Sequence, residues 1–372
     1  MIAFLTQYLY GLGHSNRIKL IAEELGKKAD VLIINQLFKP PLEFSVPQVS
    51  FLEDSEIPEG KSISGFVMNE NMKNYRVKRF IETIEKYNVK VLVSEGFPFC
   101  RHQYADELFK CFDACKERGI KIIVSIRDFP WDDPHDDQLK DWVNLTQNLI
   151  CKHYVEKILV HGDPKILPLY SDRTKYSHSK QIIKQIDKQI IYTGYVCDNS
   201  AKPHERKNNI IYVSTGLNKQ EGMLLFKEIT KIASKFKDYH FVMPVANRYL
   251  KTGKSIKDNM IFVEYIPKLG EKIQDCAAFI TYGGYNSTME ILASGVPSII
   301  VPRQDGHKVE QFVRAYAFEP YGFFKVLNNK EFSKLPKTLE YILSNKPKPF
   351  LFNLEGAKRS SDEILRIYKK TS

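Results

Sequence analysis

Short apolar runs alternate with longer amphipathic segments along the first half of the chain. The runs are rich in Val and Ile and are bounded by polar or glycine-containing segments, which is typical of buried strands. They are Ile2–Thr6, Val31–Asn35, Val89–Ser94, Lys121–Ser125, Lys157–His161 and Ile190–Thr193. Between them, apolar residues recur at helical spacing over Ser15–Leu25, Lys73–Tyr87, Tyr104–Arg118 and Asp137–Cys151. Largely apolar strands that are separated by helices predict a parallel sheet with helices on both faces.

The alternation stops at Cys197–Asn209, a polar segment without periodicity in which we predict a linker, and then restarts. The second half predicts strands at Ile210–Ser214, His240–Pro244, Met260–Glu264, Ala277–Tyr282 and Ser298–Val301, and helices at Gly222–Lys235, Asn286–Ser294, Glu310–Phe318 and Leu354–Lys370. Two successive series predict an α/β chain of two doubly wound, Rossmann-like domains that face a cleft. The predicted parts are an N-terminal domain (1–196), the linker (197–209), a C-terminal domain (210–353) and a closing helix (354–372) that packs back on the N-terminal domain.

The length and composition agree with this organisation. A chain of 372 residues is too long for one compact core, and 43% hydrophobic with 27% charged residues is ordinary for a globular protein. The longest apolar runs, such as Val296–Pro302, are far shorter than the roughly 18–20 residues that cross a bilayer. Met1–His14 has no basic residues before its apolar run, so we expect a first strand there and not a signal peptide. The six cysteines form no CxxC pair, which indicates reduced structural thiols, a cytoplasmic location and no zinc site.

The formal net charge of +11 attracts nucleic acid, anionic lipid or phosphorylated ligands. We expect no nucleic-acid partner, because the sequence has no zinc finger, no RNA-binding aromatic signature and no concentrated arginine block. A weak contact with the anionic inner face of the membrane stays open for an enzyme with a lipid-linked acceptor.

The first candidate site is the segment Gly11–Arg17, which follows a predicted strand and opens a helix. Glycines such as Gly13 let the backbone approach a ligand closely, and a helix N-terminus attracts phosphate. His14 would lie at the mouth of the cleft as a base or as a hydrogen-bond partner of a phosphate. The alternative is an ordinary turn in which Ser15 or Asn16 caps the helix.

The second candidate site is the segment Thr281–Glu290, which again runs from a strand through glycines into a helix. Gly283 and Gly284 would open the turn, and three polar residues would cap the helix and bind a diphosphate. These three are Asn286, Ser287 and Thr288. Glu290 would accept both hydroxyls of a ribose. The alternative is a capping box, in which Ser287 and Glu290 satisfy each other's backbone donors.

Further polar loops follow other predicted strands, at the carboxyl ends where α/β folds place ligands. The candidates are Gly216, Arg303, Glu310 and Gln311 in the second half, and Glu95 and Asp128 in the first half. Glu310 and Gln311 would bind sugar hydroxyls, whereas Glu95 and Asp128 bring carboxylates beside aromatic residues, a combination that suits sugar binding. The alternatives are a favourable helix dipole for Glu310 and simple turn chemistry for the acidic loops.

Together these segments resemble a known family. Gly283–Arg303 with Glu310 and Gln311 is similar to the C-terminal donor domain of glycosyltransferases related to the peptidoglycan UDP-N-acetylglucosamine transferase. The likeness is closer to a bacterial group of predicted glycosyltransferases, whose motifs span most of the chain in the same order. They are Gly11–Arg17, Glu95–Phe99, Ile126–Asp128 with Asp132–Pro134, Val160–Pro164, Tyr192–Val196 and Gly283–Ala315. The segment Tyr282–Tyr285 departs from the Arg-Ser-Gly-Ala type of the peptidoglycan enzyme, which leaves the donor sugar open.

The resemblance implies a GT-B fold, a nucleoside-diphosphate sugar donor and no obligatory metal or other cofactor. Transferred to this sequence, it places Ser287 and Thr288 at the diphosphate and Glu290 at the ribose. The remaining implied assignments are Glu310 and Gln311 at the donor sugar, Ile266 at the base and His14 at the reacting centre.

Our hypothesis is the transfer of a sugar from a UDP donor to an acceptor hydroxyl. Backbone N–H groups at Gly283–Thr288 would stabilise the leaving diphosphate, and His14, or a carboxylate such as Glu95 or Asp128, would take the acceptor proton. One alternative is a nucleotide-sugar hydrolase in which His14 activates water, and another is a non-catalytic protein that binds sugar nucleotides. The sequence leaves open the donor sugar, the acceptor, the retaining or inverting outcome and the oligomeric state.

Overall fold

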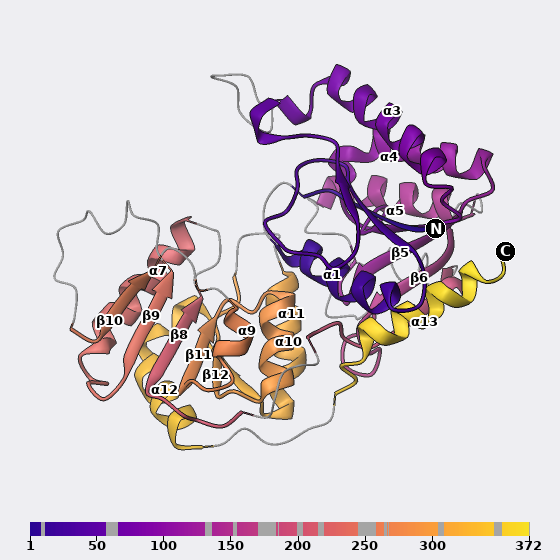
Figure 1. The fold of residues 1–372 in the computed structure, drawn as a ribbon. Coiled ribbons are helices and arrows are strands. Elements are labelled where there is room, and N and C mark those ends of the chain that lie inside the picture. Colours follow the sequence, from indigo (N-terminus) through magenta and orange to yellow (C-terminus); the bar gives the residue numbers. More distant parts are fainter. Residues whose placement is uncertain are drawn as a thin grey trace. The chain divides into compact units, whose positions relative to one another are not determined.

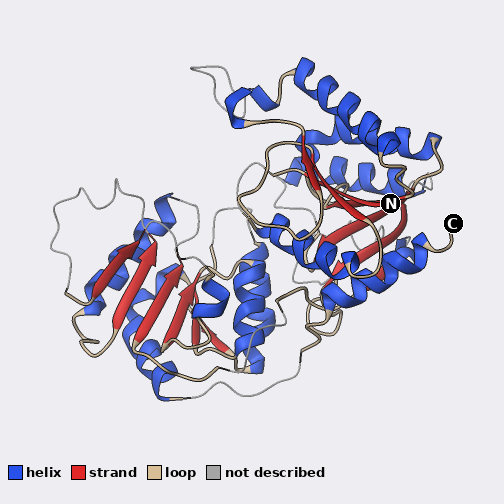
Figure 2. Ribbon diagram, viewed as in Figure 1, coloured by secondary structure: helices blue, strands red, loops and turns tan. Residues whose placement is uncertain are grey.

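The computed structural model describes residues 1–8, 12–56, 66–130, 136–151, 155–169, 184, 186–198, 204–214, 219–244, 258–263, 266, 268–303, 309–345 and 352–371. The chain divides into two compact units (Figures 1 and 2). Unit 1 consists of Met1–Val196 and Glu355–Ser372, and unit 2 of Cys197–Leu354.

Unit 1 is built on a parallel sheet. Its described residues contribute seven strands in the order β3-β2-β1-β4-β5-β6-β7. The strands are β1 Ile2–Thr6, β2 Val31–Asn35, β3 Gln48–Ser50, β4 Val91–Glu95, β5 Lys121–Arg127, β6 Val155–His161 and β7 Ile190–Tyr192. Every residue of β1, β2 and β4 is buried, because central strands of a parallel sheet are covered on both faces.

Helices cover both faces of this sheet (Figure 1). They are α1 Gly13–Gly26, α3 Glu70–Lys86, α4 Ala105–Glu117, α5 Asp136–Cys151 and α13 Gly356–Tyr368. Helices α1 and α13 pack together on one face, where Ile18, Ile21 and Ile364 share a core with alternate strand residues such as Phe4 and Ile33. Helices α3, α4 and α5 lie on the other face.

Unit 2 has the same plan. Its described residues contribute six parallel strands in the order β10-β9-β8-β11-β12-β13. The strands are β8 Ile210–Ser214, β9 His240–Pro244, β10 Met260–Val263, β11 Ala278–Thr281, β12 Ser298–Ile300 and β13 Phe324–Val326, and the helices are α7 Lys219–Ala233, α9 Leu269–Lys272, α10 Tyr285–Ser294, α11 Glu310–Phe318 and α12 Leu335–Ser344. Leu225 and Ile229 of α7 and Leu335 and Leu339 of α12 join the strand core around Val213.

The predicted α/β architecture with two doubly wound parallel sheets is confirmed. The sequence prediction misses β3, β13, α9 and α12. In the stretch predicted as a linker, backbone N–H groups between His204 and Asn208 donate to carbonyls of Ser294, Gln274 and Asp275, so this stretch lies along unit 2. Among the described residues, no helix combines the length and the apolar character that a membrane span requires.

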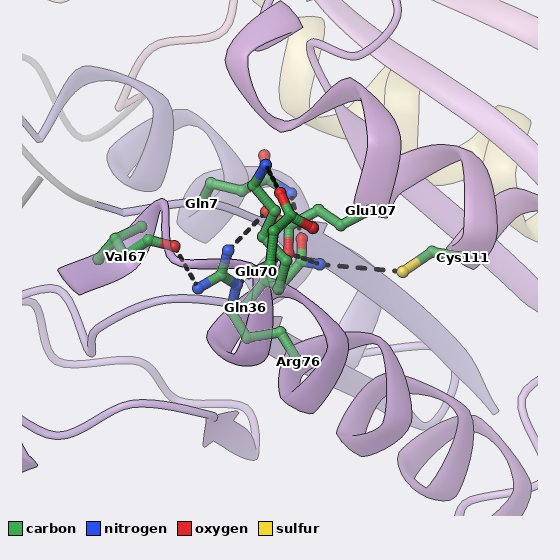
Figure 3. A network of polar contacts seen from close by, with 8 residues as sticks. Gln7, Gln36, Val67, Glu70, Arg76, Glu107 and Cys111 are labelled. Carbon is green, nitrogen blue, oxygen red and sulfur yellow. Dashed lines mark hydrogen bonds and ion pairs between the residues drawn. The ribbon is translucent and has the colours of Figure 1, made fainter. Parts of the chain in front are cut away.

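A buried ion pair joins α3 to α4 and reaches the residues that follow β1 and β2 (Figure 3). Arg76 donates to both carboxylate oxygens of Glu107 and to the carbonyl oxygen of Val67, each at 2.8 Å. Gln36 donates to Glu107 at 3.5 Å and accepts from Gln7 at 3.0 Å. Both charged side chains are fully buried. Burial raises the pKa of Glu107 and Arg76 opposes this rise, so each charge depends on its partner.

We expect Arg76→Ala to lower the free energy of unfolding by about 3–5 kcal/mol, because it leaves the Glu107 carboxylate buried without its counter-charge. Denaturant unfolding followed by circular dichroism measures this change. Lys78→Ala is the control, because it removes a cation from the same helix at a side chain that is 78% exposed, and it should leave stability unchanged. Equal losses in the two variants would contradict the assigned role of the pair.

Candidate active site at the carboxyl edges of the two sheets

In each unit the strand order reverses between two central strands, and α/β folds bind ligands at this point. The two strands are β1 and β4 in unit 1, and β8 and β11 in unit 2. Helix α1 follows β1 and helix α10 follows β11, so both predicted glycine segments lie at these switch points. Gly216, predicted for the loop after β8, lies outside the described residues.

Helix α1 begins at Gly13, which makes His14 the second residue of its first turn. Leu12 occupies the N-cap position and no side chain caps the helix, so the alternative in which Ser15 or Asn16 is the cap is wrong. The physical reason is that the helix starts two residues earlier than its apolar pattern indicates. The side chain of Ser15 is instead buried within the helix.

The imidazole of His14 contacts a buried carboxylate. His14 Nδ1 lies 2.9 Å from Oε1 of Glu95, the last residue of β4. Arg17, one turn further along α1, donates from Nη2 to the same Glu95 oxygen. The side chains of Glu95 and Arg17 are each 1% exposed, whereas that of His14 is 17% exposed. His14 is therefore the member of this cluster that can reach a ligand.

The electrostatics of the cluster favour a neutral imidazole. Burial lowers the pKa of His14 well below its usual value, and the positive charges of Arg101, Arg127 and Arg17 lower it further. Burial raises the pKa of Glu95, but Arg17 and a hydrogen bond from Ser125 oppose that rise. An ionised Glu95 accepts the proton of Nδ1, and the other ring nitrogen, Nε2, then carries the lone pair that a base needs.

Asp128, the third predicted acid–base group, is also buried. It follows β5, is 1% exposed and lies against Gly162, where an added Cβ would come within 2.9 Å of the Asp128 Cβ. Of the predicted trio His14, Glu95 and Asp128, the structure thus leaves His14 partly exposed and buries both carboxylates.

In unit 2 the segment before α10 requires glycine at one position. Gly283 has φ +72°, and a Cβ there would lie 2.5 Å from Ile300 Cγ2 on the neighbouring strand β12. Gly284 is the N-cap, the helix begins at Tyr285, and no side chain caps it. The predicted caps Asn286, Ser287 and Thr288 therefore lie within the first turn of the helix. Both the capping prediction and the capping-box alternative are wrong.

The polar residues of this first turn differ in their accessibility. Asn286 and Ser287 are partly exposed, whereas Thr288 is fully buried. The Thr288 hydroxyl donates back to the carbonyl oxygens of Gly283 and Gly284, at 3.3 and 3.1 Å. In this structure the Thr288 side chain therefore fixes the glycine turn.

Glu290 lies beside the short helix α9. A Cβ on Gly270 would be 3.3 Å from Glu290 Oε1, so the absence of a side chain at Gly270 makes room for this carboxylate. Burial, with a smaller contribution from the like charge of Asp198, raises the pKa of Glu290 to about 7. Its charge therefore changes near neutral pH.

Helix α11 brings its predicted residues toward the start of α10. Gln311 accepts a hydrogen bond from the backbone N–H of Arg303 at 3.3 Å. Glu310 accepts from the buried Arg314 at 2.5 Å, and the Arg314 guanidinium lies 5.4 Å from the ring centroid of Tyr285, the first residue of α10. The Arg303 guanidinium similarly lies over the ring of Tyr282, at 5.1 Å. Ile266, predicted at the base, is a buried residue of the same unit.

The sequence prediction assigned no role to Ser125 or His161, and it included Arg17 as the last residue of the candidate segment Gly11–Arg17. All three side chains are buried and polar at the carboxyl edge of unit 1. The sequence signal for Ser125 and His161 is their position at the ends of predicted strands. Within the described parts of the chain, no three His, Cys, Asp or Glu side chains gather as a metal site would require.

Comparisons with known proteins agree with the two-domain fold. Residues 219–365 match the sequence model of the glycosyltransferase family 28 C-terminal domain. The chain is 28% identical to the uncharacterized UDP-glucosyltransferase YojK of Bacillus subtilis, over 44% of this chain and 41% of YojK. It is 24% identical to a UDP-N-acetylglucosamine–N-acetylmuramyl-(pentapeptide) pyrophosphoryl-undecaprenol N-acetylglucosamine transferase of Thermosipho africanus, over 40% of this chain and 43% of that protein. The alignments thus cover less than half of either relative.

The likeness in structure extends over the whole chain. The glycosyltransferase of kitacinnamycin superposes with a TM-score of 0.62, covering 100% of this chain and 98% of its own, at 13% identity. At this level of identity the superposition establishes the fold. The resemblance noted in the sequence is therefore confirmed: this chain has the GT-B fold of two Rossmann-like domains, and its residues 219–365 are similar to the glycosyltransferase family 28 C-terminal domain.

Proposed function

We propose that this protein is a glycosyltransferase that moves a sugar from a UDP-sugar donor to an acceptor hydroxyl, with His14 as the base. The observation that carries the proposal is the His14–Glu95 contact of 2.9 Å at the switch point of unit 1, in a chain whose residues 219–365 match the family 28 C-terminal domain. The relatives named above are UDP-sugar transferases, which supports a UDP donor.

The donor would bind at the switch point of unit 2. The start of α10 carries the partial positive charge of a helix N-terminus, and Gly283 and Gly284 let a diphosphate approach its backbone. Ser287 is the partly exposed hydroxyl of the first turn and would donate to the diphosphate. Backbone and helix dipoles then stabilise the leaving group, so the proposal includes no obligatory metal or other cofactor.

Other residues of unit 2 would hold the rest of the donor. Glu290 would accept hydrogen bonds from the ribose hydroxyls in its ionised form. Gln311, Glu310 and Arg303 cluster next to the start of α10, which supports contacts with the sugar. Ile266 would support the base. The Thr288 hydroxyl bonds to backbone carbonyls, so we assign it to the geometry of the turn and its backbone to the diphosphate.

In the reaction, the acceptor hydroxyl oxygen would form a bond to the anomeric carbon while the bond from that carbon to the diphosphate oxygen breaks. His14 Nε2 would take the acceptor proton, and Glu95 would stabilise the resulting imidazolium. The negative charge that develops on the UDP would lie at the start of α10.

The acceptor and the location belong to the same proposal. The net charge of +11 and a relative whose name specifies an undecaprenol-linked substrate together support an acceptor at the inner face of the membrane. The protein would then be cytoplasmic and attached only peripherally.

We expect His14→Ala to lower acceptor-dependent UDP release by about 10²–10⁴-fold, because it removes the base. The measurement is UDP release from UDP-sugars by purified protein, with and without a membrane extract as the acceptor source. His240→Ala is the matched control, because His240 is exposed on β9 of unit 2, and its activity should equal that of the wild type.

UDP release that needs no acceptor and is lost in His14→Ala would show that the protein hydrolyses the nucleotide sugar and does not transfer its sugar. Binding of UDP-sugars without any release would indicate a non-catalytic binding protein. If no UDP-sugar binds, the donor site itself is wrong.

We expect the affinity for UDP-glucose to fall as the pH drops below about 7, because Glu290 has a pKa of about 7 and its protonated form accepts ribose hydrogen bonds poorly. Glu290→Gln should bind roughly 10- to 100-fold more weakly at pH 8 and should lose this pH dependence, since hydrogen bonds to a charged group contribute about 1.5–3 kcal/mol. Calorimetric titration between pH 6 and pH 8 measures both effects. A wild-type affinity that is flat over this range would contradict the assignment of Glu290 to the ribose.

A further inference from the structure

A chain of buried hydrogen bonds continues from Glu95 away from His14. Oε2 of Glu95 accepts from the Ser125 hydroxyl on β5 at 2.9 Å. Ser125 Oγ lies 2.8 Å from Nε2 of His161, the last residue of β6. His161 Nδ1 lies 2.9 Å from Oγ1 of Thr193, which follows β7. Each of these side chains is at most 1% exposed, so this series of hydrogen bonds runs from β4 across β5 and β6 to the residue after β7 without contact with water.

The proton positions along this series of hydrogen bonds follow from the number of hydrogen atoms that each side chain can donate. An ionised Glu95 can only accept, so the single hydroxyl proton of Ser125 points to Glu95 Oε2. The Ser125 oxygen must then accept from His161, which fixes the His161 proton on Nε2. His161 Nδ1 is left as an acceptor for the hydroxyl of Thr193, whose contact with this nitrogen, at 2.9 Å, is shorter than its contacts with the carbonyl oxygens of Val160 and Gly194, both at 3.3 Å. All donors therefore point toward Glu95, and we assign one tautomer to each histidine.

The backbone around His161 is adapted to this contact. Gly162 follows it directly and has no room for a side chain beside Asp128. Ser360 of α13 lies 3.4 Å from His161 Nδ1, and its hydroxyl donates to the carbonyl oxygen of Gly356 at 2.6 Å. At Gly356 a Cβ would lie 2.5 Å from the carbonyl oxygen of Gly194, so glycine lets α13 start in contact with the segment after Thr193.

The position of His161 differs chemically from that of its neighbours. Leu159, two residues earlier on the same face of β6, belongs to the apolar core. A histidine in such a place costs desolvation unless both ring nitrogens are paired, and here both are. Burial lowers the pKa of His161 well below its usual value, which keeps the ring neutral. A neutral ring with one donor and one acceptor can orient Ser125 and, through it, Glu95. It adds no net charge to the cluster.

We propose that His161 is a positioning residue for His14: held by Thr193, it orients Ser125 toward Glu95, so that Glu95 fixes His14 with Nδ1 protonated and Nε2 open to the acceptor. The kinetic part of this proposal rests on the proposed function. The orientation of His14 is a property of unit 1 alone and can be tested without turnover.

The test compares His161→Met with His161→Gln. The two side chains are similar in length, but Gln keeps an N–H that can donate to Ser125 and Met does not. Ser125→Ala removes the next link directly. Thr146→Val is the matched control: Thr146 is fully buried in the same unit, and its hydroxyl bonds to backbone carbonyls of Pro98 and Trp142 outside the chain of contacts.

The first readout is nitrogen NMR of imidazole-labelled protein, with the His14 signals assigned from His14→Ala. We expect wild type and Thr146→Val to show His14 protonated at Nδ1 only, and His161→Met and Ser125→Ala to show a mixture of tautomers. His161→Gln should restore the single tautomer. The second readout is steady-state kinetics, in which His161→Met should lower kcat about 10-fold with the donor KM unchanged, because only part of the base contribution is lost.

An unchanged His14 spectrum in both His161→Met and Ser125→Ala would overturn the proposal, as would a mixture of tautomers in the wild type. If His161→Met does not fold, the His14 spectrum of Ser125→Ala decides whether the proposal holds. If the wild type turns over no sugar donor, the proposed function fails, while the spectrum still decides the role of His161.

Discussion

The carboxylate of Glu95 is the group on which the site of unit 1 depends. A carboxylate that is 1% exposed is stable in its ionised form only if its oxygens are paired, and an unpaired buried charge would cost several kcal/mol. Arg17 provides the counter-charge, Ser125 pairs the second oxygen, and the remaining hydrogen bond goes to His14. The requirement to satisfy one buried charge thus brings together residues from α1, β4 and β5. It also sets the direction of every proton between His161 and His14.

The parallel sheets explain why this convergence occurs at one edge. All strands of a parallel sheet present their carboxyl ends at the same side, so Glu95, Arg127 and His161, each the last residue of its strand, become neighbours although they are far apart in sequence. The same logic brings Gly283 of unit 2 beside Ile300 on the adjacent strand. In both units the loop after a central strand leads into a helix, whose first backbone N–H groups have no acceptor within the helix.

The sequence predicts the central strands closely because their apolar runs are continuous, and β1, β2, β8 and β9 have the predicted bounds. It misses β3 and β13 because neither has a continuous apolar run: β3 contains one apolar residue, Val49, and Lys325 interrupts β13. Helix starts are also misplaced, since a polar residue such as Ser15 or Ser287 is a good cap by composition, whereas the glycine turn before it decides where the helix begins. His14 was predictable from its place after a glycine loop. The role of Ser125 was not, because a serine within an apolar strand gives no indication of which neighbouring strand end it faces.

Helix α13, which the sequence predicts as a closing helix, adds a constraint on unit 1. The family 28 match runs from residue 219 to residue 365 and therefore ends inside α13, which packs on α1 in unit 1. This helix buries Ile364 in the same core as Ile18 and Ile21, and it places Ser360 against His161. The end of the segment that matches the family 28 domain is thus a structural part of the unit that contains His14. Because α1 carries His14 on its first turn and α13 packs along its length, the position of His14 depends on contacts made from both ends of the chain.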